Sequence, residues 1–559
     1  MVLHTDVAVV GAGPVGATLA NLLRAYDVPA VVIDRDAGVV PYPRAVAIDD
    51  ESLRSFQAAG VVQAVLPDLI QNAPIRYHDS KGRVLAHVRP AGQPFGWPRR
   101  NLFYQPLMEE ALRAGLEGSP IVSFLPSTAV TELHQDPDGV SLQVHGPRGH
   151  EAIRARYVVG ADGGRSFVRR SVGVALTGST APTKWLVVDV EHDTLDAPYS
   201  AVYCDPDRPS MTIPLPYGRR RFEFKLVPGE TEDEVVTDRA VRQLLRSFYP
   251  DGPLPVVLRA RVYWHHSRVA SRFSAGRVFL AGDAAHLQPP FFGQGMNSGI
   301  RDATNLAWKL AAVCHGWGGP QLLDSYDSER RTHAETMVSF ATRIGAMYQP
   351  RNRGTEVVRD AFFRGVQHIP GARDYILQMK YKPLPRYTNG IVVAAGKGEA
   401  AAVGRMFPQP WVQDAAGSRL KLDDAIGRSF ALIGLGIDPA DHLPETSLAY
   451  WRSTGAAVVR VDPTTTAQRA TPEGSKGSAG RADTVRLRDL DGVFRDLRLE
   501  RPEVDIIVLR PDRYVAAVAP APRLEAVTAR LRALIGEADG AGAAAPGAEV
   551  TGRTTALTA

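Results

Sequence analysis

The sequence predicts an α/β protein with a Rossmann-like dinucleotide-binding domain, a domain of antiparallel β-strands and a separate C-terminal α/β domain. Three observations carry this prediction. A strand, a glycine-rich turn, a helix and a second strand follow one another over residues 5–36. Apolar and polar residues alternate through residues 183–265, as they do in antiparallel sheets. A new mixture of strand and helix patterns begins near residue 390, and a chain of 559 residues accommodates about three domains.

Composition and charge argue against several classes of protein. The formal net charge of +5 comes from basic residues dispersed among acidic ones, so we expect no nucleic-acid partner. No apolar run approaches the roughly 18 residues that a membrane span needs, so we expect no membrane partner. The two cysteines, Cys204 and Cys314, lie too far apart for a metal or redox motif, and no secretion signal is visible. We therefore expect a cytoplasmic protein without a bound metal.

The first glycine-rich turn has the residues that a bound dinucleotide requires. The stretch GAGPVG, residues 11–16, separates the buried strand DVAVV from the helix that follows. Gly11 permits the tight turn, Gly13 leaves room for a pyrophosphate, and Gly16 lets the helix pack closely on the strand. The helix N-terminus presents free N–H groups, and Asp34 at the end of the second strand can accept hydrogen bonds from ribose hydroxyls. This complete context favours a dinucleotide site.

Two further glycine-rich turns also follow apolar strands. The stretch GADGGRS comes directly after the run YVV and contains Asp162 and Gly163. The stretch VFLAGDAAHLQPPFFGQGMNSG, residues 278–299, opens a long helix, and its glycines let backbone N–H groups face a ligand. Asp283 within it follows a buried strand and is a candidate acceptor on the ribose or the phosphate side. Each turn alone is typical of an ordinary structural turn, but the three in this order indicate one dinucleotide site.

The remaining elements follow from the spacing of apolar residues. We expect a helix over residues 101–117 with Pro106 near its start, and short strands over residues 120–160. We expect two long helices over residues 297–316 and 322–345.

These patterns predict the domain boundaries. The nucleotide-binding domain is expected to comprise residues 1–182 and 267–385, with a helical extension. A substrate-binding β-sheet domain is expected over residues 183–266, and the C-terminal domain over residues 390–537. Residues 538–559 are rich in Gly and Ala and poor in large apolar side chains, so we expect a disordered tail.

Together the three turns resemble the fingerprints of the flavoprotein aromatic hydroxylase family over residues 5–380. Longer strings, among them YPRAVAIDDESLR, FGWPRRNLFYQP and GDAAHLQPPFFGQGMNSGIRDATNLAWKL, are similar to the branch that hydroxylates phenylpropionates. The resemblance implies non-covalent FAD, NAD(P)H as co-substrate, and ortho-hydroxylation of a phenolic acid by dioxygen in aromatic catabolism. It also implies a thioredoxin-like C-terminal domain, although no CxxC pair is present to give that domain a thiol redox role.

The resemblance also carries roles to matching positions. It implies the following cofactor-binding residues: Gly11, Gly13, Gly16, Asp34, Arg35, Arg44, Gln105, Asp162, Gly163, Asp283, Pro290, Gly293, Gly295, Met296 and Asn297. Arg44 matches the arginine over the FAD pyrophosphate, and Gln105 matches the glutamine on the ribityl side. Residues 290–297 match the loop whose N–H groups stabilise negative charge on the reduced flavin. The family usually has glutamate where Asp34 stands, so the ribose contact is expected to be longer or mediated by water here.

The substrate side departs from the family pattern. Residues 213–216, IPLP, replace the serine and arginine that clamp a benzoate carboxylate, so a simple benzoate is not expected. Arg219 and Arg221 lie on one face of a predicted strand and are the candidate receivers of a propionate carboxylate. The alternative is that these two arginines, and Arg220 between them, are only surface charges.

Candidates for the contact with the phenol oxygen are Tyr203, His265, His266 and Asp49. Tyr203, in the stretch AVYCD, matches a family tyrosine, and histidine is the commonest general base near neutral pH. The alternative for His265 and His266 is a structural role at the end of a strand. The alternative for Asp49 and its neighbour Asp50 is capping of the helix ESLRSFQAAG.

Three alternatives stay open for the function. The same chemistry can serve a larger phenolic or polyketide substrate, or the chain can bind flavin without hydroxylating, or it can bind only NAD(P) through the first turn. The last alternative leaves the second and third turns unexplained, and the halogenase stretch WxWxIP is absent from the sequence. The choice between NADH and NADPH is open, as is the oligomeric state, for which a homodimer is one option.

Overall fold

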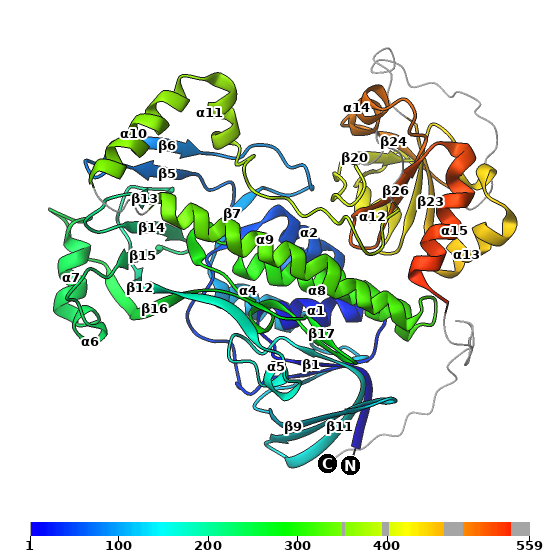
Figure 1. The fold of residues 1–559 in the computed structure, drawn as a ribbon, viewed down its shortest axis with the longest axis horizontal. Coiled ribbons are helices and arrows are strands. Elements are labelled where there is room, and N and C mark those ends of the chain that lie inside the picture. Colours follow the sequence, from blue (N-terminus) through cyan, green and yellow to red (C-terminus); the bar gives the residue numbers. More distant parts are fainter. Residues whose placement is uncertain (1, 349–352, 394–401, 463–483, 538–559) are drawn as a thin grey trace.

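The computed structural model describes residues 2–348, 353–393, 402–462 and 484–537 (Figure 1). The tail that was predicted to be disordered lies outside these residues. Two large sheets occupy the bottom and the upper left of Figure 1, and the C-terminal domain occupies the upper right. The long helices α8 (Gly295–Cys314) and α9 (Asp324–Tyr348) cross the centre of the molecule between them. None of the helices in the described ranges is both long and apolar enough to cross a membrane.

The first sheet contains the predicted strand–turn–helix–strand unit. Its central strand β1 (Val2–Val10) pairs in parallel with β2 (Ala30–Ile33) and with β11 (Gly149–Gly160). The last four residues of β1 are buried because the sheet is covered on both faces, and helix α1 (Pro14–Ala25) packs between it and α8. The other elements of this unit are β8 (Val122–Leu125), β9 (Ala129–Asp136), β10 (Gly139–Gly146), β17 (Ser274–Ala275), β18 (Val278–Leu280) and α5 (Phe167–Ser171).

The second sheet has the strand order β19-β16-β12-β15-β14-β13-β5-β6. These strands are β5 (Ile75–His78), β6 (Val84–Val88), β12 (Leu176–Glu191), β13 (Ser200–Tyr203), β14 (Ser210–Leu215), β15 (Arg219–Lys225), β16 (Val256–Ala270) and β19 (His286–Leu287). One face packs on α6 (Glu232–Val235) and α7 (Asp238–Arg246) through a core that contains Leu186, Phe222 and Leu245. At the other end, α10 (Arg353–Gln367) and α11 (Pro370–Leu377) pack on β6.

This sheet is larger than its predicted continuous segment. Strand β5 pairs in parallel with β13, which brings residues 75–88 into the sheet although they precede the second glycine-rich turn. The sequence placed residues 75–88 with the nucleotide-binding domain. The sequence does not predict a parallel pairing between such distant segments. The reason is that apolar and polar residues alternate along each strand in the same way whether or not the two strands pair.

A small third sheet joins the two large ones. It consists of β3 (Ala47–Asp49), β7 (Arg100–Phe103) and β4 (Leu69–Ile70). Strand β3 leads into α2 (Asp50–Ala59), where the Asp49 carboxylate accepts a hydrogen bond from the Ser52 N–H (3.0 Å), so the predicted capping by Asp49 is confirmed. The next helices are α3 (Val62–Val65) and α4 (Gln105–Ala114). The helix predicted from residue 101 begins later because residues 100–103 pair as a strand.

The C-terminal domain is built on a mixed sheet that packs against α8. Its strand order is β21-β20-β24-β23-β22-β25-β26, and the Phe430 ring lies 5.6 Å from the Trp308 ring of α8. The strands are β20 (Trp411–Asp414), β21 (Arg419–Lys421), β22 (Ala431–Leu435), β23 (Ala457–Asp462), β24 (Val485–Asp489), β25 (Ile506–Leu509) and β26 (Val515–Ala519). The helices are α12 (Leu422–Ile426), α13 (Glu445–Ser453), α14 (Val493–Glu500) and α15 (Leu524–Ile535). Its thioredoxin-like character stays a prediction.

Candidate active site

A deep cleft of about 1200 Å³ runs from the carboxyl ends of β1 and β2 to the inner face of the second sheet. Every cofactor-binding residue predicted above except Gly16 lines it. The structure thus brings the three glycine-rich turns together around one elongated space. The individual roles of these residues stay predictions.

The three glycines of the first turn are required for different reasons. Gly11 has a backbone φ of +102°, and a β-carbon there would lie 2.5 Å from the Ala161 carbonyl oxygen. A β-carbon on Gly16 would lie 1.8 Å from the Gly11 carbonyl oxygen, so this glycine allows α1 to pack against the turn. A β-carbon on Gly13 would meet nothing within 4 Å, and Gly13 lines the cleft. Gly13 therefore leaves open space in front of the N-terminus of α1, where a phosphate can approach.

Asp34 and Asp162, the two predicted acids at this end of the cleft, differ in whether both carboxylate oxygens already accept hydrogen bonds. Asp34 Oδ2 accepts a hydrogen bond from the Ala12 N–H (2.7 Å), and Asp34 Oδ1 accepts one from the Asp36 N–H (2.9 Å). Asp162 Oδ2 accepts hydrogen bonds from the first residues of α5, but its Oδ1 is buried with no partner among the described residues. Since Asp162 lines the cleft, Oδ1 is available to a ligand hydroxyl.

The backbone of Arg44 is held from both sides in the middle of the cleft. Gln105 Oε1 accepts hydrogen bonds from the N–H groups of Arg44 (2.8 Å) and Ala45 (2.6 Å). Arg221 donates to the carbonyl oxygens of Arg44 (2.9 Å) and Pro43 (2.5 Å). The Arg44 guanidinium itself has no hydrogen bond or ion pair with any described residue. Gln105 and Arg221 therefore clamp the backbone of Arg44, while its side chain presents a free cation to the cleft.

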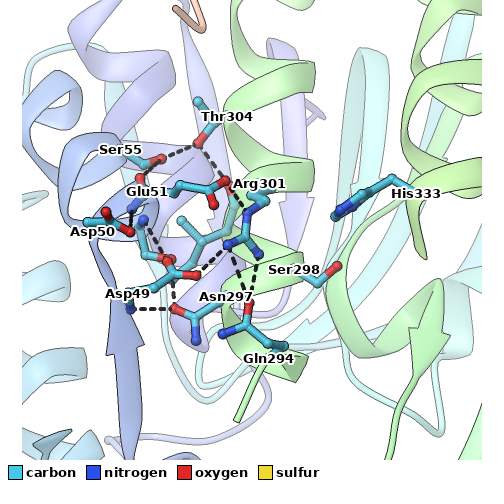
Figure 2. Close-up of polar contacts among 12 residues, drawn as sticks. Asp49, Asp50, Glu51, Ser55, Gln294, Asn297, Ser298, Arg301, Thr304 and His333 are labelled. Carbon is cyan, nitrogen blue, oxygen red and sulfur yellow. Dashed lines mark hydrogen bonds and ion pairs between the residues drawn. The ribbon is translucent and has the colours of Figure 1, made fainter. Parts of the chain in front are cut away.

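The start of α8 is tied to the start of α2 by a buried polar network (Figure 2). Asn297 Oδ1 accepts hydrogen bonds from the Asp49 N–H (3.1 Å) and from the Ser52 hydroxyl (2.7 Å). Arg301 pairs with Asp49 and with Glu51, the latter at 2.7 Å. This network ties Asn297, at the end of the loop that lines the cleft, to the start of α2.

Asp50 stands apart from this network, pointing away from Arg301 in Figure 2. Arg301 and Lys382 both pair with its neighbours Asp49 and Glu51, so the cations are already shared with two carboxylates. Burial, and then the negative charge of Asp49, raises the pKa of Asp50 to about 8. Asp50 therefore carries a proton inside the cleft near neutral pH.

Comparison with known proteins decides the family. The FAD binding domain family matches residues 4–341, and the HcaD C-terminal domain family matches residues 404–534. A 3-(3-hydroxy-phenyl)propionate/3-hydroxycinnamic acid hydroxylase of Burkholderia vietnamiensis is 45% identical, over 95% of this chain and 96% of its own length. A hydroxylase of the same name from Mycolicibacterium smegmatis is 41% identical over 93% of this chain and 91% of its own. The chain belongs to the FAD-dependent aromatic hydroxylases.

Solved structures of this family have the same architecture. A complex of aklavinone-11 hydroxylase with FAD and aklavinone is 26% identical, with a TM-score of 0.74 over 94% of this chain and 98% of its own. The flavin-dependent monooxygenase PieE, in complex with FAD and substrate, is 24% identical and shares the fold with a TM-score of 0.78 over 95% of this chain and 99% of its own. The predicted α/β fold class is confirmed.

The cleft of this hydroxylase fits FAD by its own chemistry. The open space at Gly13, the free cation of Arg44 and the unpartnered Asp162 oxygen suit a pyrophosphate flanked by hydroxyl groups. When bound, FAD supplies the activation of dioxygen with electrons from NAD(P)H. Asp283 also faces the cleft, and the enclosing protein raises the pKa of this carboxyl.

The hydroxylase does not bring Tyr203, His265 or His266 to this cleft, whereas Asp49, the fourth candidate for the phenol contact, lines it. Ser200 and Val202 of β13 line it, so strand alternation turns Tyr203 to the other face, where it stacks on His78 at 5.1 Å between ring centroids. His265 lies behind Phe291, which lines the cleft, and burial lowers the pKa of His265 to about 4. His266 hydrogen-bonds to Thr180 (2.9 Å) outside the cleft. The structural alternative is therefore favoured for His265 and His266.

The two arginines predicted to receive a carboxylate are also differently placed. Arg219 does not line the cleft, and its guanidinium lies 4.4 Å from the centre of the Tyr104 ring. Arg221 lines the cleft, but Asp189 already pairs with it through both carboxylate oxygens (2.8 and 3.1 Å). Because its partner stands directly opposite on β12, Arg221 is neutralised before any substrate enters. Neither position suits the predicted role.

Three cleft residues were missed by the sequence reasoning. The amide oxygen and nitrogen of Gln288 are both buried, and neither is hydrogen-bonded among the described residues. Tyr77 of β5 and Arg100 of β7 line the inner end beside the second sheet. The string FGWPRRNLFYQP contains Arg100, but nothing local distinguishes it from its neighbour Arg99.

We expect Arg221→Met to weaken FAD binding about tenfold, the equivalent of about 1.4 kcal/mol, because it removes two hydrogen bonds that position the backbone of Arg44. Titration of the apoprotein with FAD measures the effect. Arg219→Met, on the same strand but outside the cleft, is the matched control and should leave the affinity unchanged. Equal FAD affinities of the two variants would contradict the clamp.

We expect Asp50→Asn to flatten the pH dependence of stability. The folded-state pKa of about 8 exceeds the unfolded value near 3.9, so the folded state favours the protonated acid. Its stabilisation is complete below about pH 4 and is lost as the pH rises through about 8, by up to roughly 1.4 kcal/mol per unit. Urea unfolding at pH 5 and pH 8 should show the wild type losing more than the variant. Asp138→Asn, at an exposed turn, is the control, and equal slopes for all three proteins would refute the assignment.

Proposed function

We propose that the enzyme converts 3-(3-hydroxyphenyl)propionate into 3-(2,3-dihydroxyphenyl)propionate in aromatic catabolism. The observation that carries the proposal is the similarity, along almost the whole chain, to hydroxylases named for this phenolic acid. One oxygen atom of dioxygen enters the ring ortho to the phenol hydroxyl, the other leaves as water, and NAD(P)H supplies the two electrons. The choice between NADH and NADPH is part of the test below.

The inner end of the cleft supports this chemistry. Ile75 of β5, Val202 of β13, and Met211 and Ile213 of β14 project from three neighbouring strands into the cleft and form an apolar wall. An apolar wall suits a benzene ring and keeps water from the oxygen-activating centre, which prevents loss of the reducing equivalents as hydrogen peroxide.

A larger phenolic or polyketide substrate is the second candidate. A separate apolar cavity of about 570 Å³ lies beyond Tyr77, which lines both this cavity and the cleft. A shift of Tyr77 and the neighbouring Tyr381 would join the two spaces and make room for a polycyclic ligand.

The experiment that tests the function is a substrate panel. The purified holoenzyme is supplied with NADH or NADPH and with 3-(3-hydroxyphenyl)propionate, 3-hydroxycinnamate, 3-ethylphenol or a polycyclic phenol. Hydroxylated product and hydrogen peroxide are both measured. We expect the propionate to give the fastest turnover with the least peroxide, whereas faster and better-coupled turnover of the polycyclic phenol would favour the second candidate.

We further propose that the enzyme acts in the cytoplasm, where its free thiols Cys204 and Cys314 persist, and that it can form a homodimer. Sedimentation of the holoenzyme over a range of concentrations would measure the oligomeric state.

A further inference from the structure

The basic residues of the cleft differ in whether they already have a partner. Arg221 pairs with Asp189, and Lys382 pairs with Asp49 at 2.9 Å. Arg44 is free but lies with Asp283 in the middle of the cleft, where the predicted FAD pyrophosphate would occupy it. Arg100 lines the inner end, where it contacts Ser200 beside the apolar wall.

Arg100 is half-buried in the wall of the cleft and has no acidic partner in the part of the chain that the structure describes. No carboxylate among the described residues lies within ion-pair distance of its guanidinium, and only Tyr77 and Tyr381 act on it electrostatically. Burial lowers the pKa of Arg100 to about 10, although those two tyrosines act in the opposite direction. A half-buried guanidinium without a counter-charge is costly, so an anion that enters the cleft would find here an unpaired positive charge.

The Arg100 guanidinium is also held in a fixed orientation. Its Nη1 donates to the Ala73 carbonyl oxygen (2.7 Å), and its Nη2 donates to the Ser200 hydroxyl (2.9 Å). A guanidinium has five N–H donors, so these two bonds anchor it and leave three for a ligand. The planar fork of an arginine matches the two oxygens of a carboxylate.

The surroundings select a carboxylate attached to an aromatic ring. Tyr77, whose hydroxyl group shares a hydrogen bond with Tyr381, stands next to Arg100 and offers a second polar contact. Val202, two residues after Ser200 on the same strand, belongs to the apolar wall, so the wall begins next to the polar groups of Arg100, Ser200 and Tyr77. A ligand with a carboxylate at one end and a ring at the other satisfies both surfaces.

We propose that Arg100, anchored by Ser200 and the Ala73 carbonyl and flanked by Tyr77, receives the carboxylate of the substrate. This inference rests on the proposed function, in which the substrate is an arylpropionate. It replaces Arg219 and Arg221 as the carboxylate receivers. It also assigns Arg100 as the residue that selects a phenolic acid over a neutral phenol.

The test compares an acid with a neutral ligand of similar shape. Dissociation constants of 3-(3-hydroxyphenyl)propionate and 3-ethylphenol are measured from the flavin difference spectrum of the holoenzyme. We expect Arg100→Met to raise the constant for the propionate by roughly 30-fold or more, as for a lost enclosed charge pair, and that for 3-ethylphenol by less than about threefold. Equal losses for the two ligands would overturn the assignment.

Matched variants keep the test decisive. Arg76→Met, on β5 with its guanidinium over Tyr199 outside the cleft, should bind both ligands like the wild type. Should Arg100→Met not fold, Arg100→Lys keeps the charge without the fork, and Ser200→Ala removes one anchor. Each of these should weaken the propionate selectively by several-fold, and an unchanged preference for the acid in both would overturn the proposal.

Failure of the proposed substrate is distinguishable from failure of the carboxylate site. If the wild type prefers another phenolic acid and Arg100→Met abolishes that preference, the propionate is the wrong substrate and Arg100 keeps its role. If the wild type prefers the propionate and Arg100→Met preserves the preference, the role of Arg100 is overturned alone. A wild type that binds 3-ethylphenol as tightly as every acid would overturn both.

Discussion

A valine at position 13 is expected to abolish FAD binding while leaving the apoprotein folded. The backbone φ of Gly13 is −72°, which any residue adopts, and its β-carbon would meet nothing within 4 Å. The valine side chain would instead occupy the space between the N-terminus of α1 and the pyrophosphate. We expect the affinity for FAD to fall at least about 100-fold, or about 2.7 kcal/mol. The visible absorbance of the purified protein and a titration with FAD measure it.

Gly16→Val is the control that separates the cofactor from the fold. A β-carbon at residue 16 would lie 1.8 Å from a backbone oxygen, so this variant should lose stability as well as FAD. Thermal unfolding of the two apoproteins should therefore differ, with Gly13→Val close to the wild type. Full flavin content in Gly13→Val would show that the turn does not hold FAD.

Arg301→Met is expected to destabilise the protein by about 3–5 kcal/mol. Arg301 is buried, and its guanidinium pairs with Asp49 and with Glu51, two buried carboxylates. Among the described residues, Lys382 alone would then pair with them. The same loss should loosen the start of α8 and lower the FAD content, since the network in Figure 2 ties Asn297, at the end of the loop that lines the cleft, to the start of α2. Urea unfolding of the holoenzyme and its flavin content measure the two effects.

Removing the carboxylates together with the arginine provides the control. The triple variant Asp49→Asn, Glu51→Gln, Arg301→Met has no uncompensated acid and should recover much of the lost stability. Arg301→Lys should be intermediate, because one ammonium cannot pair with both acids as the guanidinium fork does. A loss below about 1 kcal/mol in Arg301→Met would mean that the charge network contributes little to the fold.

The nucleotide-binding half of the site could be predicted because its requirements are local. The close approach of Gly16 to Gly11, and the positive φ of Gly11, follow from residues within one turn of the chain. The capping by Asp49 depends only on the Ser52 N–H three residues later. Such constraints act between neighbours, so they leave a readable pattern in the sequence.

The substrate half could not be predicted because it depends on which strands pair. Tyr203 faces away from the cleft and Val202 faces into it, and only the orientation of β13 within the sheet selects between these two faces. Arg221 is neutralised by Asp189, a residue distant in the chain that the antiparallel register of β12 and β15 places directly opposite.

The amino-acid sequence by itself determined the family, the cofactor and the backbone turns that receive the phosphates. Only the tertiary structure decided which charged and aromatic side chains reach the inner end of the cleft. The parallel pairing of β5 with β13 places Tyr77 and Ser200 on the inner wall, and the β7 strand brings Arg100 to Ser200. The physical reason is that a glycine turn constrains its own backbone, whereas a side chain acquires its partners from strands that meet only when the chain has folded.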